Sequence, residues 1–159
     1  MRKHLGINPG QIRRGVMFLA IVAIVVVIAV MRPEAQTGAN VIAADQAYEM
    51  AQNGELVIID IRTPGEWRES GVAEPALQLS MPADVTEAGF LAKFNAIKDQ
   101  NPGKNVAIIC ATGGRSGWMH AELEKNGMGG TLNISEGMFG NELGEGWIKR
   151  GLPVRPSSL

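Results

Sequence analysis

The 159-residue sequence contains one cysteine and two histidines. A single cysteine, Cys110, cannot form a disulfide within the chain, and so few soft ligands do not favour a zinc or iron–sulfur centre. Aromatic residues make up only 5% of the chain, and the formal net charge is −1. Without an excess of basic residues the sequence has no electrostatic footprint for nucleic acid. Neither a metal nor nucleic acid is therefore expected as a partner.

The composition that remains is that of a folded protein. Hydrophobic residues make up 45% of the chain and charged residues 19%, which is too apolar for a disordered segment. The charge is unevenly distributed, since residues 1–39 carry five basic residues and one acidic residue, and residues 40–159 carry ten and fifteen. Such an asymmetry suggests a membrane-facing end joined to one soluble domain.

The amino-terminal segment contains an unbroken apolar run, in which every residue from Val16 to Met31 is hydrophobic. A spanning helix needs about 20 apolar residues, with a lower limit of about 17, which the run reaches if Gly15 is included. Arg14 and Arg32 flank the run and can extend to the two membrane interfaces. A cleaved signal peptide is the alternative, but its apolar region usually has about 7–15 residues, and Arg32-Pro33-Glu34 is a poor cleavage site.

Basic residues near the run indicate its orientation. Four of them precede it and only Arg32 follows closely, so the amino terminus is expected in the cytoplasm and the soluble domain across the membrane. The sequence thus predicts a single-pass protein of the inner or plasma membrane with a periplasmic or other extracytoplasmic domain. The expected parts are a basic cytoplasmic N-terminus (1–15), a transmembrane signal anchor in the lipid bilayer (16–31), a linker (32–40) and the soluble domain (41–159).

The soluble domain alternates between two patterns. Short apolar runs rich in branched residues predict buried parallel strands at 55–61 and 105–110, and weaker runs predict strands at 131–134, 76–79 and 41–42. Helices are predicted at 44–52, 87–100 and 116–126, and over part of 138–150. This alternation predicts an α/β fold with a mainly parallel central sheet and helices on both faces.

Ligands of such sheets bind beyond the carboxyl ends of the strands. Asp60 and Arg62 lie at one predicted strand end, and Cys110 lies at another. The loop that follows Cys110 joins a strand to a helix and contains Gly113 and Gly114, which allow backbone amides to turn inward as an anion nest. The amides and the positive helix end both favour the thiolate. A lone cysteine after an apolar run is otherwise a small buried hydrophobe.

The loop residues have distinct expected roles. The side chains of Ala111 and Thr112 are small and are expected to leave the mouth of the loop open. Arg115 opposes the dipole of the helix that it begins, which suggests an anion to be bound. Ser116 is expected to cap the helix or donate to that anion. We interpret Trp118, Phe139 and Trp147 as packing residues.

The loop from Cys110 to Arg115 resembles the active-site loop of single-domain rhodaneses, which are sulfurtransferases. The resemblance extends over most of residues 41–156: residues 59–67 are similar to the family's Asp-x-Arg and Glu-aromatic motif, and residues 137–138 and 146–154 to its Gly…Trp…Gly-Leu-Pro-Val ending. Two stretches depart from the pattern. Residues 72–76 replace the family's usual His-Ile-Pro-Gly-Ala, and residues 139–145 form a longer spacer.

The resemblance implies a rhodanese-like fold and a sulfurtransferase that needs no metal or organic cofactor. Cys110 would attack a small anionic sulfur donor such as thiosulfate and carry a persulfide, which a thiol, a protein thiol or cyanide then accepts. The backbone amides from Ala111 to Ser116 would stabilise the charged sulfur, and Arg115 would orient the donor. Asp60, Arg62 and Glu66 would support the loop, although neighbouring opposite charges commonly form local ion pairs only.

Two other interpretations remain open. The domain would be a tethered persulfide carrier, a thiol-redox sensor or a binding module if it does not turn over repeatedly. A cysteine phosphatase also uses a cysteine, an anion loop and an arginine. Its motif has five residues between the cysteine and the arginine, whereas four residues separate Cys110 from Arg115, so this reading is the weaker one.

Overall fold

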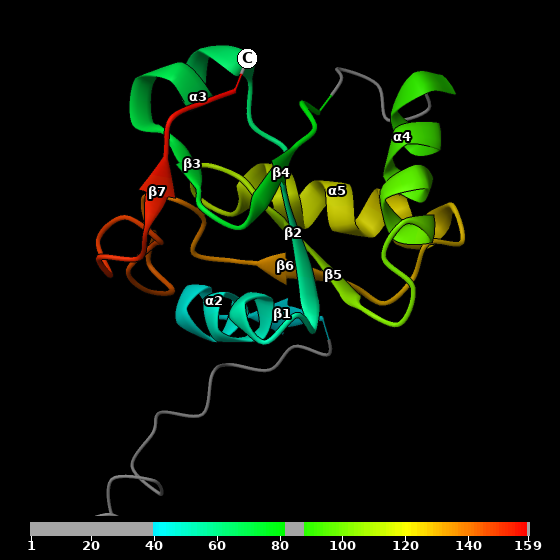
Figure 1. Ribbon diagram of the computed structural model, residues 1–159, viewed down its shortest axis with the longest axis horizontal. Helices are drawn as coiled ribbons and strands as arrows, with labels where there is room; N and C mark the ends of the chain where they lie inside the picture. Colours follow the sequence, from blue (N-terminus) through cyan, green and yellow to red (C-terminus); the bar gives the residue numbers. More distant parts are fainter. Residues whose placement is uncertain (1–39, 82–87, 159) are drawn as a thin grey trace, which may run out of the picture. The chain divides into compact units, whose positions relative to one another are not determined.

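The structure, a computed structural model, describes residues 40–81 and 88–158. Five parallel strands form the central sheet in the order β1-β6-β5-β2-β4, and β3 and β7 form a separate antiparallel pair (Figure 1). In chain order the elements are β1 (Val41–Ile42), α2 (Ala44–Gln52), β2 (Leu56–Asp60), α3 (Pro64–Ser70), β3 (Val72–Ala73), β4 (Ala76–Gln78), α4 (Ala88–Asp99), β5 (Asn105–Ile109), α5 (Gly114–Lys125), β6 (Thr131–Ile134) and β7 (Val154–Arg155). The predicted parallel sheet and its five strands are confirmed.

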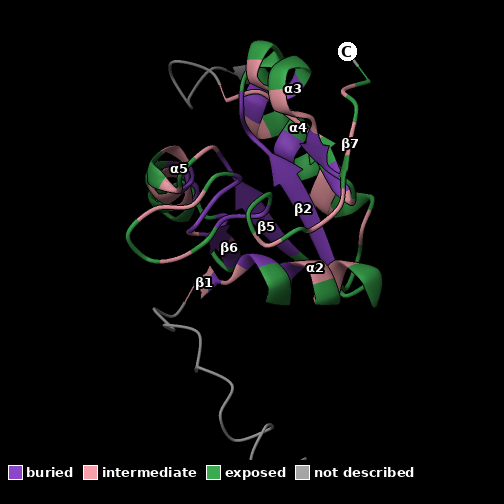
Figure 2. Ribbon diagram, turned by 90° about the vertical axis from the view of Figure 1, so that its left-hand side faces the viewer, coloured by how far each residue is buried: buried purple, intermediate pink, exposed green. Residues whose placement is uncertain are grey.

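The central strands are buried on both sides, which is why their sequences lack polar alternation. Every residue of β2 is buried, and β5 is buried after its first residue (Figure 2). The two strands pair along their full length, from Leu56 opposite Asn105 to Asp60 opposite Ile109. Their carboxyl ends therefore lie side by side at one edge of the sheet.

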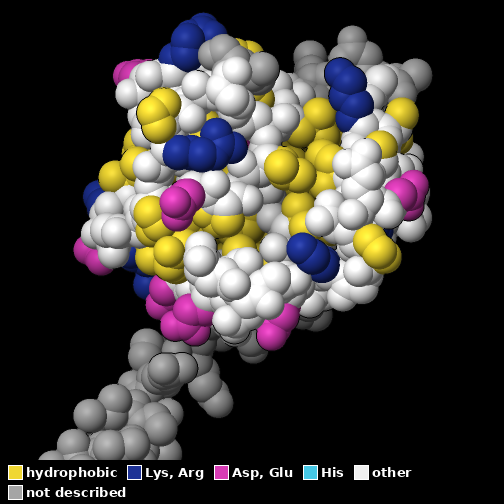
Figure 3. Space-filling model, viewed as in Figure 1, with side chains coloured by type: hydrophobic (Ala, Val, Ile, Leu, Met, Phe, Trp, Pro, Cys, Tyr) yellow, Lys and Arg dark blue, Asp and Glu magenta, His cyan; other side chains and the backbone are white. Residues whose placement is uncertain are grey.

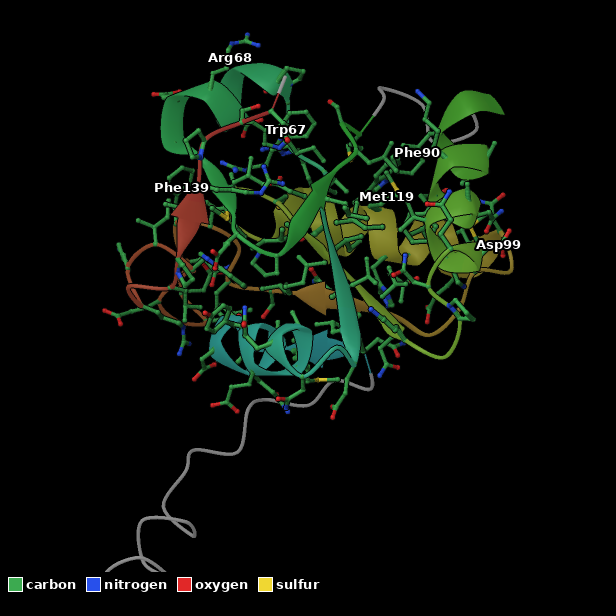
Figure 4. The ribbon with its side chains drawn as sticks, in the orientation of Figure 1. Trp67, Arg68, Phe90, Asp99, Met119 and Phe139 are labelled. Carbon is green, nitrogen blue, oxygen red and sulfur yellow. The ribbon has the colours of Figure 1, made fainter. Side chains whose placement is uncertain are left out.

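Side chains of successive strand residues point to opposite faces, and this alternation separates two apolar cores. Leu56 and Ile58 belong to a core that also contains residues of α2 and α3. Val57 and Ile59 belong to the other core, where Phe90 of α4 and Met119 of α5 pack (Figure 4). Burying an isoleucine side chain stabilises a fold by about 1.5–3 kcal/mol. The two apolar cores therefore determine which side chains of each strand point to which face of the sheet.

Helix α3 was not predicted, although its start carries a clear signal. Thr63 accepts a hydrogen bond from the backbone N–H of Glu66, and the Glu66 carboxylate accepts one from the N–H of Thr63. This reciprocal capping box, with Pro64 in the first turn, is a sequence-level mark of a helix start. The short length of the helix, seven residues, left too little apolar periodicity to detect.

The helix predicted within residues 138–150 is wrong, because this segment forms turns and an isolated bridge between Asn141 and Gly144. Its glycines explain the difference. Gly140 has φ +93°, and a Cβ built on Gly146 would lie 2.2 Å from the Gly140 nitrogen. Backbone packs directly on backbone here, which an α-helix does not permit. Residues 72–76, which differ from the family pattern, also have a role that was not predicted, because they contain β3, which pairs with β7.

The surface carries both charge signs, and Lys and Arg side chains are interspersed with Asp and Glu on the face shown in Figure 3. Among residues 40–81 and 88–158, no helix combines the length and hydropathy needed to cross a membrane. The predicted N-terminus (1–15), anchor (16–31) and all but the last residue of the linker (32–40) lie outside the described residues.

Candidate active site

Cys110 directly follows β5, and its sulfur lies at the start of α5. The Sγ atom accepts hydrogen bonds from the backbone N–H of Gly113 at 3.2 Å and of Ser116 at 3.4 Å. The Ser116 hydroxyl lies 3.4 Å from Sγ and 3.1 Å from the Gly113 carbonyl oxygen. Two backbone amides and one hydroxyl thus converge on one sulfur atom, an arrangement that stabilises negative charge there.

The start of α5 differs from an ordinary capped helix. Its N-cap residue is Gly113, which has φ +88° and no side chain to satisfy the free amides of the first turn. A Cβ at this position would lie 1.8 Å from the Ser135 carbonyl oxygen. The Cys110 sulfur takes the place of a capping side chain, because it accepts a hydrogen bond from the Ser116 N–H, which belongs to the first turn of α5.

The loop is held from outside by the segment that follows β6. Met138 N–H donates to the Cys110 carbonyl and Phe139 N–H donates to the Ala111 carbonyl, both at 2.9 Å. Gly137 permits this approach, since a Cβ there would lie 2.6 Å from the Ala111 carbonyl oxygen. The sequence predicts no contact between this segment and the loop, because nothing in its composition reports which backbone it contacts.

The small side chains of Ala111 and Thr112 do not expose the thiol, and Cys110 is only 1% exposed. Its side chain follows the parity of Val106 and Ile108 in β5, which point into the core between α4 and α5. The sulfur therefore has an apolar side toward that core and a polar side formed by the loop amides. Thr112 itself is exposed, and Ala111 is half-buried.

Arg115 forms an ion pair with Glu66 of α3. Its Nη1 lies 2.9 Å from Glu66 Oε2, and its Nη2 bonds the other carboxylate oxygen. The hydrogen bond from Arg115, aided by Thr63, lowers the pKa of Glu66 from 4.5 to about 2. The same bond raises the pKa of Arg115. The predicted anion-orienting arginine thus already has an anionic partner, which ties α3 to the Cys110 loop.

Asp60 and Arg62 form a second, fully buried ion pair at the end of β2. Arg62 Nη2 lies 2.7 Å from Asp60 Oδ2 and 2.6 Å from the Gly71 carbonyl oxygen, and Nη1 donates to Ser70 Oγ at 2.7 Å. These bonds hold the last turn of α3 rather than the Cys110 loop. Of the three predicted supporting residues, Glu66 is the one that contacts the loop, through Arg115.

The predicted packing residues divide into two groups. Trp147 is buried and donates from Nε1 to the Pro153 carbonyl at 2.9 Å, as predicted. Trp118 and Phe139 are 45% and 41% exposed, so their assignment to packing is wrong. Phe139 lies on the side of the domain away from α4 (Figure 4). Within the described ranges, no three His, Cys, Asp or Glu residues are grouped as metal ligands.

Comparisons with known proteins identify the family of the chain. The family profile of the rhodanese-like domain matches residues 43–141. A protein of Allochromatium vinosum named sulfurtransferase is 30% identical over 108 residues, which cover 68% of this chain and 86% of that protein.

Solved structures share the fold at lower sequence identity. Rv0390 from M. tuberculosis is 24% identical with a TM-score of 0.58, and the match covers 76% of this chain and all of that one. RPA3614 from Rhodopseudomonas palustris, described as a possible tyrosine phosphatase, is 22% identical with a TM-score of 0.53, covering 77% and 89%. The profile match and the relative in A. vinosum show that the chain belongs to the rhodanese-like domain family, which is of the sulfurtransferase type.

Proposed function

We propose that this protein transfers sulfane sulfur through a persulfide on Cys110. The observation that supports it most directly is the convergence of the Gly113 and Ser116 amides on Sγ. Hydrogen bonds to a charged acceptor are stronger than those to a neutral one, so these donors favour a thiolate over a thiol. They also suit the terminal sulfur of a persulfide, which is anionic.

The transfer has two balanced steps. The Cys110 thiolate attacks the outer sulfur of a donor such as thiosulfate, a sulfur–sulfur bond forms, and sulfite leaves with the electron pair of the bond that breaks. A thiol or cyanide acceptor then attacks the terminal sulfur, and the Cys110 thiolate is the leaving group. In each step a neutral sulfur atom passes from one nucleophile to another, so neither step requires an external oxidant or reductant.

The loop residues divide this work. The amides of Gly113 and Ser116 stabilise the sulfur, and Gly113, with its positive φ, supplies the backbone curvature. Arg115, held by Glu66, places one cation at the loop, and the pair as a whole is neutral. The buried Asp60–Arg62 pair holds α3 and so supports Glu66 from behind. The burial of Cys110 admits a small donor more readily than a bulky one.

The direct test is to incubate the full-length protein with thiosulfate and weigh it intact by mass spectrometry. We expect a gain of one sulfur atom, lost again on adding cyanide with release of thiocyanate. Cys110→Ser is the matched control, since it removes one atom's chemistry and little volume, and it should gain nothing. Absence of a sulfur adduct with thiosulfate and with a low-molecular-weight persulfide would contradict the proposal.

The same assay separates the alternatives. A persulfide that forms once but passes only to a protein thiol would indicate a carrier. Oxidation of Cys110 without sulfur uptake would indicate a redox sensor. Hydrolysis of an aryl phosphate, dependent on Cys110, would indicate a phosphatase. Sustained thiocyanate production above one equivalent per chain indicates the enzyme.

We infer that residues 16–31 anchor the domain in a membrane with its active site outside the cytoplasm. The support is the apolar run between Arg14 and Arg32 and the excess of positive charge before it. An exposed cysteine introduced as Glu142→Cys in Cys110→Ser should react with a membrane-impermeant maleimide in intact spheroplasts. Labelling only after lysis would contradict the orientation, and recovery in the soluble fraction would contradict the anchor.

A further inference from the structure

Asn141 lies in the turn segment that replaced the predicted helix, and it contacts the Cys110 loop. Its Nδ2 atom donates to two carbonyl oxygens, those of Thr112 and Ser135, each at 2.8 Å. Thr112 belongs to the loop, and Ser135 follows β6 directly. One side-chain amide therefore joins the loop to the end of a neighbouring strand.

The orientation of this side chain is fixed by its other bonds. Oδ1 accepts the Leu143 N–H at 2.8 Å, so the oxygen end of the carboxamide faces its own turn and the nitrogen end faces the loop. The Asn141 backbone N–H donates to the Gly144 carbonyl at 3.0 Å, and its carbonyl accepts from Gly144 N–H at 3.2 Å. The turn presents two N–H donors in a fixed direction.

The consequence for Cys110 follows from the planarity of one peptide group. In a trans peptide the C=O of Thr112 and the N–H of Gly113 point in opposite directions. The carbonyl is held outward by Asn141, and the N–H points inward to Cys110 Sγ at 3.2 Å. An accepted hydrogen bond on the carbonyl also polarises the N–H of the same peptide, which strengthens its bond to sulfur.

Each preceding peptide of the loop is held in the same way by a backbone donor, from Met138 and from Phe139. The Thr112–Gly113 peptide differs, because its outer donor is a side chain. The Ser135 carbonyl, the second acceptor of Asn141, packs against the Cα of Gly113, where a Cβ would lie 1.8 Å away. Asn141 thereby holds both sides of the contact that shapes the loop.

We propose that Asn141 is a positioning residue that sets the reactivity of Cys110 by fixing the Thr112–Gly113 peptide with its N–H toward the sulfur. The proposal rests on the proposed function for its biological meaning, but its test does not use a sulfur donor. Asn141 does not touch the transferred sulfur. It acts only through the Thr112–Gly113 peptide, whose N–H donates to Cys110 Sγ.

The experiment measures the alkylation rate of Cys110 by iodoacetamide in the full-length protein between about pH 5 and pH 9. Asn141→Ala should slow alkylation about tenfold near pH 6, the size expected when one hydrogen bond to a charged group is weakened. The ratio of the two rates should fall as the pH rises, because hydroxide then removes the thiol proton in both proteins. A change in access alone would lower the rate equally at every pH.

Asn126→Ala is the matched control. Asn126 Nδ2 donates to the Glu122 carbonyl at 2.8 Å, at the far end of α5. Its loss should leave the pH profile unchanged. If Asn141→Ala does not fold, as judged by circular dichroism, Asn141→Ser retains a short donor and should give an intermediate profile.

An unchanged profile in a folded Asn141 variant, or a fall that is equal at all pH values, would overturn the inference. These outcomes are distinct from failure of the proposed function. A wild-type protein that takes no sulfur while its Asn141 variant shifts the profile would refute sulfur transfer and leave the positioning role intact. Sulfur uptake with an unmoved profile would do the reverse.

Discussion

The ends of β2 and β5 lie next to each other in the sheet, and both lead into a helix, yet they satisfy their polar groups in opposite ways. At the end of β2, the free amides of α3 are met by Thr63, and the charges of Asp60 and Arg62 are met by each other. At the end of β5, the cap residue Gly113 has no side chain, and the amides of Gly113 and Ser116 meet the Cys110 sulfur.

The end of β2 is thus a structural strand end, and the end of β5 is a reactive one. Ion pairs and caps fix geometry, because the Arg62 guanidinium and the Glu66 amide of α3 already have their acceptors. Amides that are directed at one ionisable atom stabilise that atom more strongly when it is negatively charged. A nucleophilic sulfur requires this kind of environment. The Glu66–Arg115 ion pair connects the two ends.

The largest expected effect is at the end of β2, where Asp60 and Arg62 form an ion pair with each other. Arg62→Met leaves the Asp60 carboxylate buried without its partner and should destabilise the fold by about 3–5 kcal/mol. Urea denaturation measures this. Adding Asp60→Asn should restore part of the stability, since the isolated charge is removed. A single variant within about 1 kcal/mol of wild type would show that the pair is not the structural support described above.

The next effect is at the reactive end. Gly113→Ala places a methyl group against the Ser135 carbonyl at a positive φ, and should cost about 2–3 kcal/mol with loss of most sulfur transfer. Gly114→Ala is the matched control, because nothing lies within 4 Å of its added Cβ. Its unfolding free energy and transfer rate should stay near wild type. Equal effects at both positions would refute the loop geometry.

A smaller effect tests the side-chain cap of α3, which has no counterpart in α5. Thr63→Ala removes the side-chain acceptor of α3 and should lower the unfolding free energy by about 1 kcal/mol. Thr63→Ser keeps the hydroxyl and should recover most of it. Cys110 alkylation should be unchanged in both. Slower alkylation in Thr63→Ala would mean that the two strand ends are less independent than the comparison holds.

The smallest effect concerns pH. Glu66 has a pKa of about 2 in the folded protein against an ordinary 4.5, so its stabilising contribution is complete above about pH 4.5 and is lost as pH falls through 2. Glu66→Gln should lower stability at pH 7 by less than about 1 kcal/mol, because the ion pair is partly exposed. The difference from wild type should shrink toward pH 2. A difference that grows in acid would contradict the pairing.

The fold was readable from the sequence where local patterns coincide with burial. The apolar runs at 55–61 and 105–110 became β2 and β5, and the predicted helices at 44–52 and 87–100 became α2 and α4 within a residue of their bounds. A strand whose residues are apolar on both faces fits only in the interior of a small domain, so its pattern predicts its position. The helix expected within 138–150 failed because glycine-mediated backbone contacts between distant turns override its weak apolar periodicity.

The site was readable in part. Cys110, Gly113 and Ser116 follow from the requirement for a thiol, backbone curvature and free amides at a helix start. The burial of Cys110, the pairing of Arg115 with Glu66 and the contact of Asn141 with Thr112 were not foreseen. The two contacts join residues far apart in the chain, and the burial of Cys110 depends on helices packed from elsewhere, so no local pattern reports any of the three.

The sequence by itself determined the five strands of the central sheet, the helices α2, α4 and α5, the position of the one thiol at a strand end and the glycine that lets its loop curve. These are properties of local propensity and burial. Only the tertiary structure decided which groups surround the sulfur, because the segments after β6 and at the start of α3 reach the loop through the packing of the whole sheet. Reactivity at Cys110 depends on those long-range contacts, whereas the pattern of each buried strand and helix is written in its own stretch of sequence.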